Sequence, residues 1–206
     1  MAEQNRYIMK KNNLVQFVQS LILLPVMSMS ISLGGIENTG IVSNVLVEKF
    51  NIEIKNNVDI ALQKAREIKA EAIDAYFKSK DMPLHGTGMK MVLEAEKNNL
   101  DWRLLPAIAI RESTGGKNDC NRVKNNAFGW GSCKIGFKSI GESIEVVAWN
   151  LGGNNPNTER HYNNKTTKQI LRAYNPPSIV PNYVPQVMSI MKTIGDADVV
   201  PVDMNT

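Results

Sequence analysis

The sequence has few of the residues that build metal, redox and nucleotide sites. Its 206 residues include two cysteines and two histidines, and they do not have the spacing of a zinc-binding motif. It also has no glycine-rich P-loop that could hold a phosphate group, and no internal repeat. These absences argue against zinc-finger, P-loop and repeat proteins, and we expect neither a metal nor a cofactor.

The two cysteines, Cys120 and Cys133, lie close together in the sequence. In an exported protein two such cysteines are expected to form a disulfide, which would stabilise the fold by about 3 kcal/mol. Two free, buried thiols are the alternative, because spacing alone does not show whether the cysteines pair.

No block of one charge sign occurs, and lysine and glutamate residues are mixed along the chain. The net charge is +4 and the isoelectric point is about 9.0. A modest positive excess fits an anionic partner, such as a cell-wall polymer, a membrane surface or nucleic acid. Because no basic helix with interleaved aromatic residues is present, we expect no nucleic-acid partner.

The first 33 residues have the order of charged and apolar residues found in export signals. Arg6, Lys10 and Lys11 precede a mostly apolar stretch at 14–33, and small residues follow its densest part. This order predicts a signal peptide, and therefore an exported, extracytoplasmic protein that is secreted or held at the cell envelope. The stretch is also long enough for an uncleaved membrane anchor, although two glutamines and a proline weaken that interpretation. A buried helix of the fold is the third possibility.

The rest of the chain has helical rather than strand periodicity, which predicts a mainly α protein. Residues 34–56 have no clean period and are expected to form an irregular linker before a first helix at 58–78. In that helix an apolar stripe is formed by Ala61, Ala65, Ile68, Ala72 and Tyr76. Further helices are predicted at 89–98, 104–113, 140–151, 168–174 and 183–194, with a loop or short hairpin at 115–138. The chain then divides into a signal or anchor at 1–33, a linker and helix at 34–80, a main domain at 81–195 and a tail at 196–206.

One carboxylate stands where an apolar helix face should continue. The stripe on this face consists of Leu105, Ile108 and Ala109 at helical spacing. Glu112 occupies the next position, and two glycines shortly after it end the helix. Apolar surroundings and a helix C-terminus both disfavour the charged form, so the pKa of Glu112 should rise, as a general acid requires. The alternative is an acid at the exposed end of the stripe, or one paired with Arg111 or Lys117.

Three segments, taken in order, carry a resemblance to a known group of enzymes. They are LDWRLLPAIAIRESTGGK at 100–117, NNAFGWG at 125–131 and AYNPPSIVPNYVPQVMSIM at 173–191. In bacterial cell-wall glycosidases, similar segments form the helix that ends in Glu-Ser and carries the catalytic acid, an Asn-x-Phe-Gly cleft segment, and a late tyrosine-bearing motif. Residues 82–194 therefore resemble the lysozyme-like superfamily, which includes soluble-type lytic transglycosylases and autolysin-type endo-β-N-acetylglucosaminidases.

The resemblance implies that the main domain is a lysozyme-like helical domain with a short loop or hairpin lobe. It would act as a monomer on peptidoglycan strands and cleave the β-1,4 bond between N-acetylmuramic acid and N-acetylglucosamine. Glu112 would be the catalytic acid and Tyr174 the family tyrosine near it. The substrate-binding residues would be Ser113, Asn125, Phe128, Gly129 and Trp130, since aromatic rings and amides suit acetylated sugars. The alternatives are core packing for Phe128 and Trp130, and packing against Pro176 for Tyr174.

The chain departs from the glucosaminidase pattern in its carboxylates. Autolysin-type enzymes generally carry a second acid in a hairpin after the Asn-x-Phe-Gly segment, but residues 123–139 contain none. The nearest candidates are Asp119, Glu142 and Glu145, of which Glu142 also fits a capping box with Ser139. Because glycoside hydrolysis usually needs two carboxylates, a single acid favours transglycosylase chemistry while leaving hydrolysis open. A non-catalytic glycan-binding module with the same fold is the alternative function.

Overall fold

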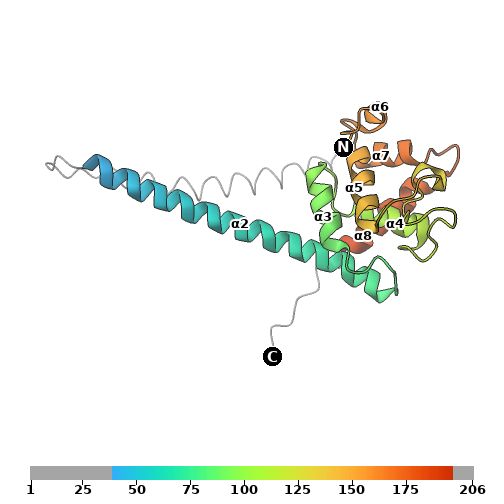
Figure 1. Cartoon of the computed structure of the whole chain (residues 1–206), viewed down its shortest axis with the longest axis horizontal. Coiled ribbons are helices and arrows are strands. Elements are labelled where there is room, and N and C mark those ends of the chain that lie inside the picture. Colours follow the sequence, from blue (N-terminus) through green and yellow to red (C-terminus); the bar gives the residue numbers. More distant parts are fainter. Residues whose placement is uncertain (1–38, 197–206) are drawn as a thin grey trace. The chain divides into compact units, whose positions relative to one another are not determined.

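The computed structural model describes residues 39–196, with side chains from Val47 onward (Figure 1). The predicted signal peptide or anchor at 1–33 and the tail at 197–206 lie outside the described residues. Within residues 39–196, no helix is both long and apolar enough to cross a membrane. The chain divides into two units between Glu53 and Ile54, and the site described below belongs to the second.

The described residues form helices joined by loops, which confirms the prediction of a mainly α protein. The helices are α2 (Thr39–Ser79), α3 (Gly88–Lys97), α4 (Leu104–Ser113), α5 (Ile140–Leu151), α6 (Glu159–Tyr162), α7 (Thr167–Tyr174) and α8 (Tyr183–Asp196). A short 3-10 helix, η1, spans Trp130–Cys133. Because residues 39–196 contain no strand, the lobe at 115–138 is a loop with one 3-10 turn and not a hairpin.

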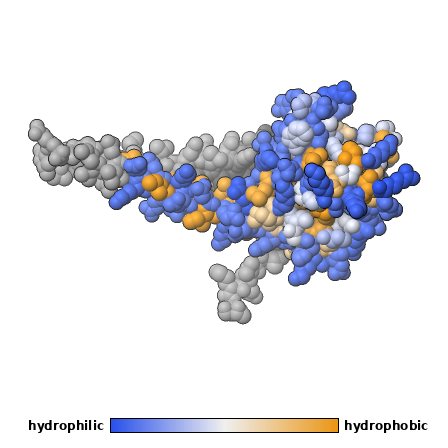
Figure 2. Space-filling view, in the orientation of Figure 1, coloured by the Kyte–Doolittle hydropathy of each residue, from blue (hydrophilic) through white to orange (hydrophobic). Residues whose placement is uncertain are grey.

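Helix α2 is much longer than predicted. It runs without interruption over Thr39–Ser79, so the prediction of an irregular linker across 39–56 is wrong. Neither glycine nor proline occurs between Ile41 and Met82, and without these breakers the helix continues. Apolar side chains such as Phe50 and Ile60 are exposed on it, as the patches along α2 in Figure 2 show. Because such residues are exposed, they need not follow a single stripe, which is why periodicity did not find this part of the helix.

The stripe predicted on α2 is only partly correct. Ala72 is buried and Tyr76 is partly buried, but Ala61, Ala65 and Ile68 are exposed. The residues of α2 that join the hydrophobic core are Ala70, Ile73 and Phe77. They are spaced by three and four residues and therefore share one helix face. Only the last turns of α2 contact the core, so the buried face is shorter than predicted and rotated relative to the predicted stripe.

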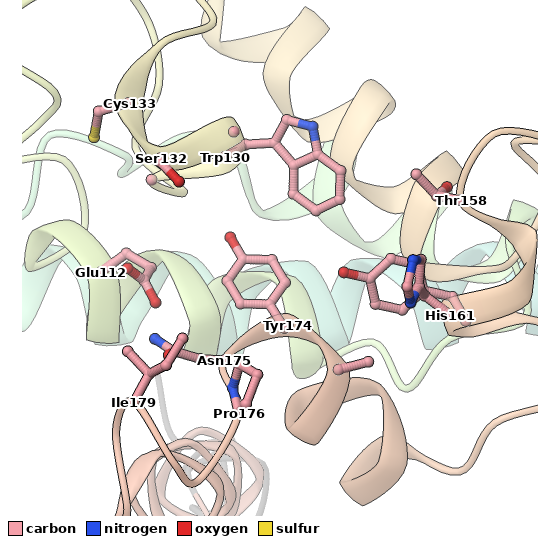
Figure 3. Close-up of a pocket in the computed structure, with 14 residues that line it drawn as sticks. Glu112, Trp130, Ser132, Cys133, Thr158, His161, Tyr174, Asn175, Pro176 and Ile179 are labelled. Atoms are coloured by element: carbon pink, nitrogen blue, oxygen red, sulfur yellow. The ribbon is translucent and has the colours of Figure 1, made fainter.

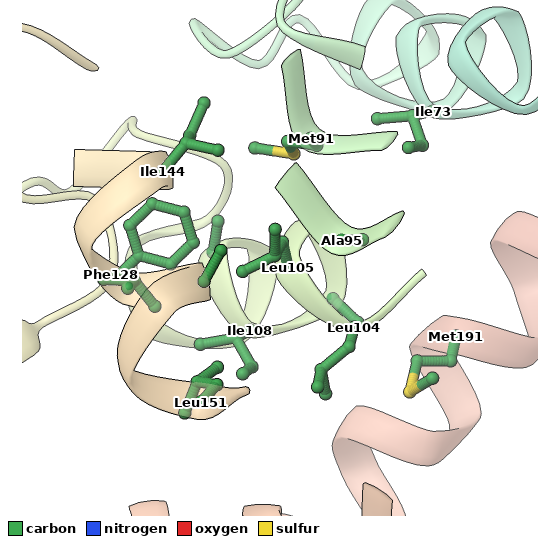
Figure 4. Close-up of a cluster of buried hydrophobic side chains, with 14 of the residues drawn as sticks. Ile73, Met91, Ala95, Leu104, Leu105, Ile108, Phe128, Ile144, Leu151 and Met191 are labelled. Atoms are coloured by element: carbon green, nitrogen blue, oxygen red, sulfur yellow. The ribbon is translucent and has the colours of Figure 1, made fainter. Parts of the chain in front are cut away.

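Helix α4 is the centre of the hydrophobic core. It packs against α3 and α8, while α3 also packs against α5 and α7 against α8. Leu104, Leu105 and Ile108 are fully buried, and Figure 4 shows them among side chains from neighbouring helices. A helix that is apolar on all sides must be enclosed by other elements. The last turn of α4 is therefore the point where polar groups can first reach solvent.

Local capping agrees with the predicted helix starts. Ser139 Oγ accepts the backbone N–H of Glu142 at 3.1 Å, which confirms Ser139 as the N-cap of α5. The Glu142 carboxylate accepts the N–H of Lys138 rather than that of Ser139. The capping box predicted for Ser139 and Glu142 is therefore only half formed. Thr166 and Gln169 form a complete capping box at the start of α7, which the sequence analysis did not identify.

The docking of α2 gives a test of the fold. Ile73 is fully buried, whereas Ile60 on the same helix is 66% exposed. Ile73→Ala should lower the free energy of unfolding by roughly 2–5 kcal/mol, because it leaves a cavity in the core. Ile60→Ala should change it by less than about 0.5 kcal/mol. Urea denaturation of the two variants checks this, and equal losses would contradict the packing of α2 on the core.

Candidate active site

Glu112 lies in the last turn of α4, where this helix leaves the core. The positions one and two turns before it on the same face are fully buried, whereas Glu112 itself is partly exposed. Thr114, with a left-handed φ of 54°, caps the helix and turns the chain away. Burial raises the pKa of Glu112 above its ordinary value, because partial removal from water penalises the charged form. The position and the direction of this shift agree with the sequence analysis.

The hydroxyl group of Tyr183, the first residue of α8, holds one oxygen of the Glu112 carboxyl group. It donates a hydrogen bond to Glu112 Oε1 at 2.6 Å, and the Tyr183 side chain is 1% exposed. Burial and the neighbouring Glu112 charge raise the pKa of Tyr183 far above its ordinary value. The phenol therefore keeps its proton and remains the donor.

Two groups oppose the effect of burial on Glu112. The hydrogen bond from Tyr183 and the positive charge of Arg111 both favour the carboxylate, so they lower the pKa that burial has raised. The Arg111 guanidinium carbon lies 5.8 Å from the Tyr183 ring centroid. Its Nε donates to Gln186 Oε1 at 2.7 Å, which fixes the arginine beside α8. Glu112 thus has a raised pKa in a setting that can still stabilise its charged form after proton transfer.

The second carboxyl oxygen, Glu112 Oε2, faces Gly129. A Cβ atom built on Gly129 would lie 3.0 Å from Glu112 Oε2, and the φ angle of this glycine is +63°. A larger residue would therefore crowd the carboxyl group and strain the backbone. Glycine at this position keeps the loop close to the acid without covering its second oxygen.

The loop that carries Gly129 is held by a buried amide. Asn126 is fully buried, and its Nδ2 donates to the carbonyls of Trp130 and Ile135 at 2.9 and 2.8 Å. Its Oδ1 accepts the N–H of Trp130 at 2.9 Å. One side chain therefore satisfies three backbone groups of this loop. It fixes the turn between Phe128 and Trp130, and with it the position of Gly129.

Tyr174, at the end of α7, connects this loop to α8. Its hydroxyl donates to the backbone carbonyl of Phe128. Its ring stacks on that of Tyr183, with centroids 6.0 Å apart and an angle of 12°. On the other side the Trp130 ring centroid is 5.7 Å away. Tyr174 lies near Glu112, as predicted, and its hydroxyl group holds the loop rather than the carboxyl group.

An open cleft of about 660 Å³ lies beside Glu112 (Figure 3). One wall is the loop from Gly129 through η1. The other lining residues are Thr158, His161 and Tyr162 in and before α6, and Ala173, Tyr174, Asn175, Pro176 and Ile179 at and after the end of α7. The Trp130 and Tyr162 ring centroids are 6.4 Å apart. Aromatic rings, an amide and a hydroxyl group thus surround one carboxyl group, a lining suited to a polar ligand with apolar faces.

The predicted binding residues divide into two groups. Gly129 and Trp130 line the cleft, but the side chains of Ser113, Asn125 and Phe128 are not among its lining. Ser113 Oγ, buried, donates to Ala127 O at 2.7 Å. Asn125 Nδ2 donates to Phe137 O at 2.8 Å, and Phe128 is fully buried in the core. These three residues shape the cleft through the backbone, and core packing is the correct alternative for Phe128.

The disulfide between Cys120 and Cys133 is present, with Cα atoms 5.5 Å apart. This confirms the predicted pairing. Cys133 ends η1 and lines the cleft. The bond therefore ties the cleft wall to the loop that follows α4.

None of the three candidate second acids lies in the lining of the cleft. Asp119 Oδ1 accepts the N–H of Cys120 at 2.7 Å, and the Glu142 carboxylate accepts the N–H of Lys138. Glu145 pairs with Lys90 at 3.3 Å. Among the residues that line the cleft, Glu112 is the single carboxylate. The same part of the chain, 39–196, contains no group of three His, Cys, Asp or Glu side chains that could hold a metal ion.

Two structural residues of the site were missed by the sequence analysis. Tyr183 was included only in the helix predicted at 183–194, with no role in the site, and Asn126 was not distinguished from Asn125. The sequence matches no protein-family model and no curated protein. The function proposed below therefore depends on the side chains of the cleft and on the three motifs.

The Tyr183 hydrogen bond predicts a shift in the titration of Glu112. Tyr183→Phe removes a bond that favours the carboxylate, so the pKa of Glu112 should rise and its titration should move to higher pH. Carboxyl-carbon NMR of labelled protein measures this directly. Tyr162→Phe is the matched control, since Tyr162 lines the same cleft without bonding Glu112. A titration that moves to lower pH in Tyr183→Phe would contradict the assigned role of the bond.

Gly129 should tolerate no side chain. Gly129→Ala places a methyl group against Glu112 Oε2 at a positive φ, so we expect a loss of about 1 kcal/mol or more of stability. Gly141→Ala is the control, because the atom nearest its Cβ, Ser139 Oγ, is 3.6 Å away. Urea denaturation of both variants makes the comparison. Equal stability of the two variants would show that the close approach of Gly129 to Glu112 is not a constraint.

Proposed function

We propose that this protein is a peptidoglycan-cleaving glycosidase with a lysozyme-like domain. The observation that carries the proposal is the half-buried Glu112 carboxyl group in the lining of the cleft, with one oxygen bonded to Tyr183 and the other next to Gly129. The three sequence motifs support it, because their resemblance to cell-wall glycosidases assigns the catalytic acid to the same residue. Peptidoglycan lies outside the membrane, so this function requires export, for which the segment at 14–33 is the candidate signal or anchor.

The lining of the cleft suits acetylated sugars. Trp130 and Tyr162 offer ring faces on which the apolar face of a sugar can stack. Asn175 offers both a donor and an acceptor, which an acetamido group requires. Thr158 adds a hydroxyl group. We therefore propose a glycan strand as the ligand, with a β-1,4 bond between N-acetylmuramic acid and N-acetylglucosamine placed at Glu112.

The chemistry follows from the proton on Glu112. Because its pKa is raised, Glu112 keeps its proton to a higher pH than an ordinary carboxyl group does. The proton passes to the glycosidic oxygen as the bond from that oxygen to the sugar C1 breaks, and the bonding electrons leave with the oxygen. Tyr183 and Arg111 then stabilise the new carboxylate. Because the protonated form is the active one, cleavage should decline as the pH rises through the pKa of Glu112.

A single carboxylate favours transglycosylation over hydrolysis. In this reaction the Glu112 carboxylate takes a proton from the 6-hydroxyl group of the muramic acid, and O6 bonds to C1. The product is a 1,6-anhydro sugar, no water is consumed, and Glu112 regains its proton. Hydrolysis generally uses a second carboxylate to activate water or to trap the sugar, and within the cleft lining there is none. Endo-β-N-acetylglucosaminidase action, which would hydrolyse the β-1,4 bond at C1 of N-acetylglucosamine instead, remains the hydrolytic form of the proposal.

The presence of a single carboxylate in the cleft lining also supports one alternative function. A cleft with one carboxylate could bind a glycan strand without cleaving it, which would make the protein a cell-wall glycan-binding module with this fold. The raised pKa of Glu112 favours the enzyme, because a binding site has no need of a protonated acid.

Glu112→Gln should abolish the release of soluble fragments from purified sacculi. The substitution keeps the size of the side chain and removes its transferable proton, so cleavage should fall by about 100-fold or more. Glu145→Gln is the matched control, since Glu145 pairs with Lys90 outside the cleft. It should retain wild-type activity.

Two results would overturn the proposal. Equal cleavage by Glu112→Gln and wild type would show that Glu112 is not the acid. Binding of sacculi by the folded wild-type protein without any release of fragments would identify a binding module instead.

A further inference from the structure

The loop lobe at 115–138 holds a concentration of positive charge. Its five basic residues and one acidic residue give a net charge of +4, equal to that of the whole chain. The basic residues are Lys117, Arg122, Lys124, Lys134 and Lys138. Within residues 39–196 none of these five forms an ion pair. Their charge is therefore uncompensated, and the lobe attracts anions.

Two of these cations line a pocket that adjoins the Glu112 cleft. The pocket has a volume of about 500 Å³, and Arg122 and Lys134 contribute its charges. It shares Ser132 and Cys133 with the cleft. In the view of Figure 3, both shared residues are on the Glu112 side of the cleft. A ligand in the cleft could therefore extend a substituent past this shared wall into the basic pocket.

The disulfide brings the two cations together. Arg122 follows Cys120 by two residues, and Lys134 directly follows Cys133. The cysteine Cα atoms are 5.5 Å apart, so the crosslink places both cations on one small surface. The N–H of Lys134 also donates to Gly131 O at 3.1 Å. Because the backbone is held before any ligand binds, ordering this pocket adds little to the cost of binding.

We propose that this basic pocket binds carboxylate groups of the peptide stems that project from the glycan strand. The inference rests on the proposed function, because it assumes that the cleft holds peptidoglycan. Each stem is attached to N-acetylmuramic acid, the sugar on one side of the bond at Glu112, so it begins close to the cleft. Arg122 can bind a carboxylate with two N–H groups, and Lys134 adds a second charge. The pocket would thus favour strands with stems over stripped strands.

The test compares two kinds of soluble glycan strand, one with its peptide stems and one from which an amidase has removed them. Binding is measured on the full chain in the Glu112→Gln background, so that no strand is cleaved. Arg122→Gln/Lys134→Gln should weaken binding of stem-bearing strands by about three- to tenfold, as expected for exposed ion pairs, and leave binding of stripped strands unchanged.

Lys168→Gln/Arg172→Gln is the matched control. It removes the same charge from a pocket that shares no residue with the cleft. Its affinities for stem-bearing and for stripped strands should therefore equal those of the Glu112→Gln protein. Circular dichroism of each variant confirms folding. The loss of affinity for stem-bearing strands in Arg122→Gln/Lys134→Gln should also become smaller at high salt, because salt screens exposed charges.

Several outcomes would overturn the inference. Equal weakening for both kinds of strand, or no weakening for either, would show that the pocket does not bind stems. Phosphodiester polymers attached to the strands can be removed with acid. If their removal weakens binding of the strands, the pocket binds phosphate groups instead of stem carboxylates. If neither kind of strand binds at all, the inference and the proposed function fail together. If wild type binds strands but cleaves none, only the enzymatic proposal fails.

Discussion

The site depends on the way the Glu112 carboxyl group is held at the edge of the hydrophobic core. Burial raises its pKa, while a 2.6 Å hydrogen bond from Tyr183 and the charge of Arg111 oppose that effect. The balance of these opposing effects on the pKa of Glu112 matters more than either effect alone. A carboxyl group in wholly apolar surroundings would hold its proton too strongly to release it, and one in water would lose it at neutral pH.

The elements around this carboxyl group come from distant parts of the chain. Helix α4 presents the acid, α8 supplies Tyr183, and the end of α7 supplies Tyr174, which bonds the loop at Phe128. Apart from the short helix η1, that loop has no regular secondary structure, and the amide of Asn126 and the disulfide hold it. The cleft is therefore open to solvent and yet fixed in shape, as the proposed cleavage of one bond beside one acid would require.

The sequence was most informative where periodicity and burial coincide. The bounds of α4 and the position of Glu112 were predicted because a carboxylate interrupts a strong apolar stripe. The long extension of α2 was not predicted, since exposed apolar residues such as Phe50 need not form a stripe that periodicity can detect. Tyr183 was missed because a tyrosine on an apolar stripe resembles core packing, and its partner is remote in sequence. Spacing also could not show which of Asn125 and Asn126 points inward.

The proposed chemistry requires Glu112 to act without a second carboxylate. Digestion of purified sacculi by the wild-type protein in water labelled with heavy oxygen, followed by mass spectrometry of the soluble fragments, tests it most directly. The account predicts fragments with 1,6-anhydro ends that carry no label, because the sugar's own hydroxyl group closes the ring. Labelled reducing ends on the fragments would require an activated water molecule, and would contradict a mechanism that relies on Glu112 alone.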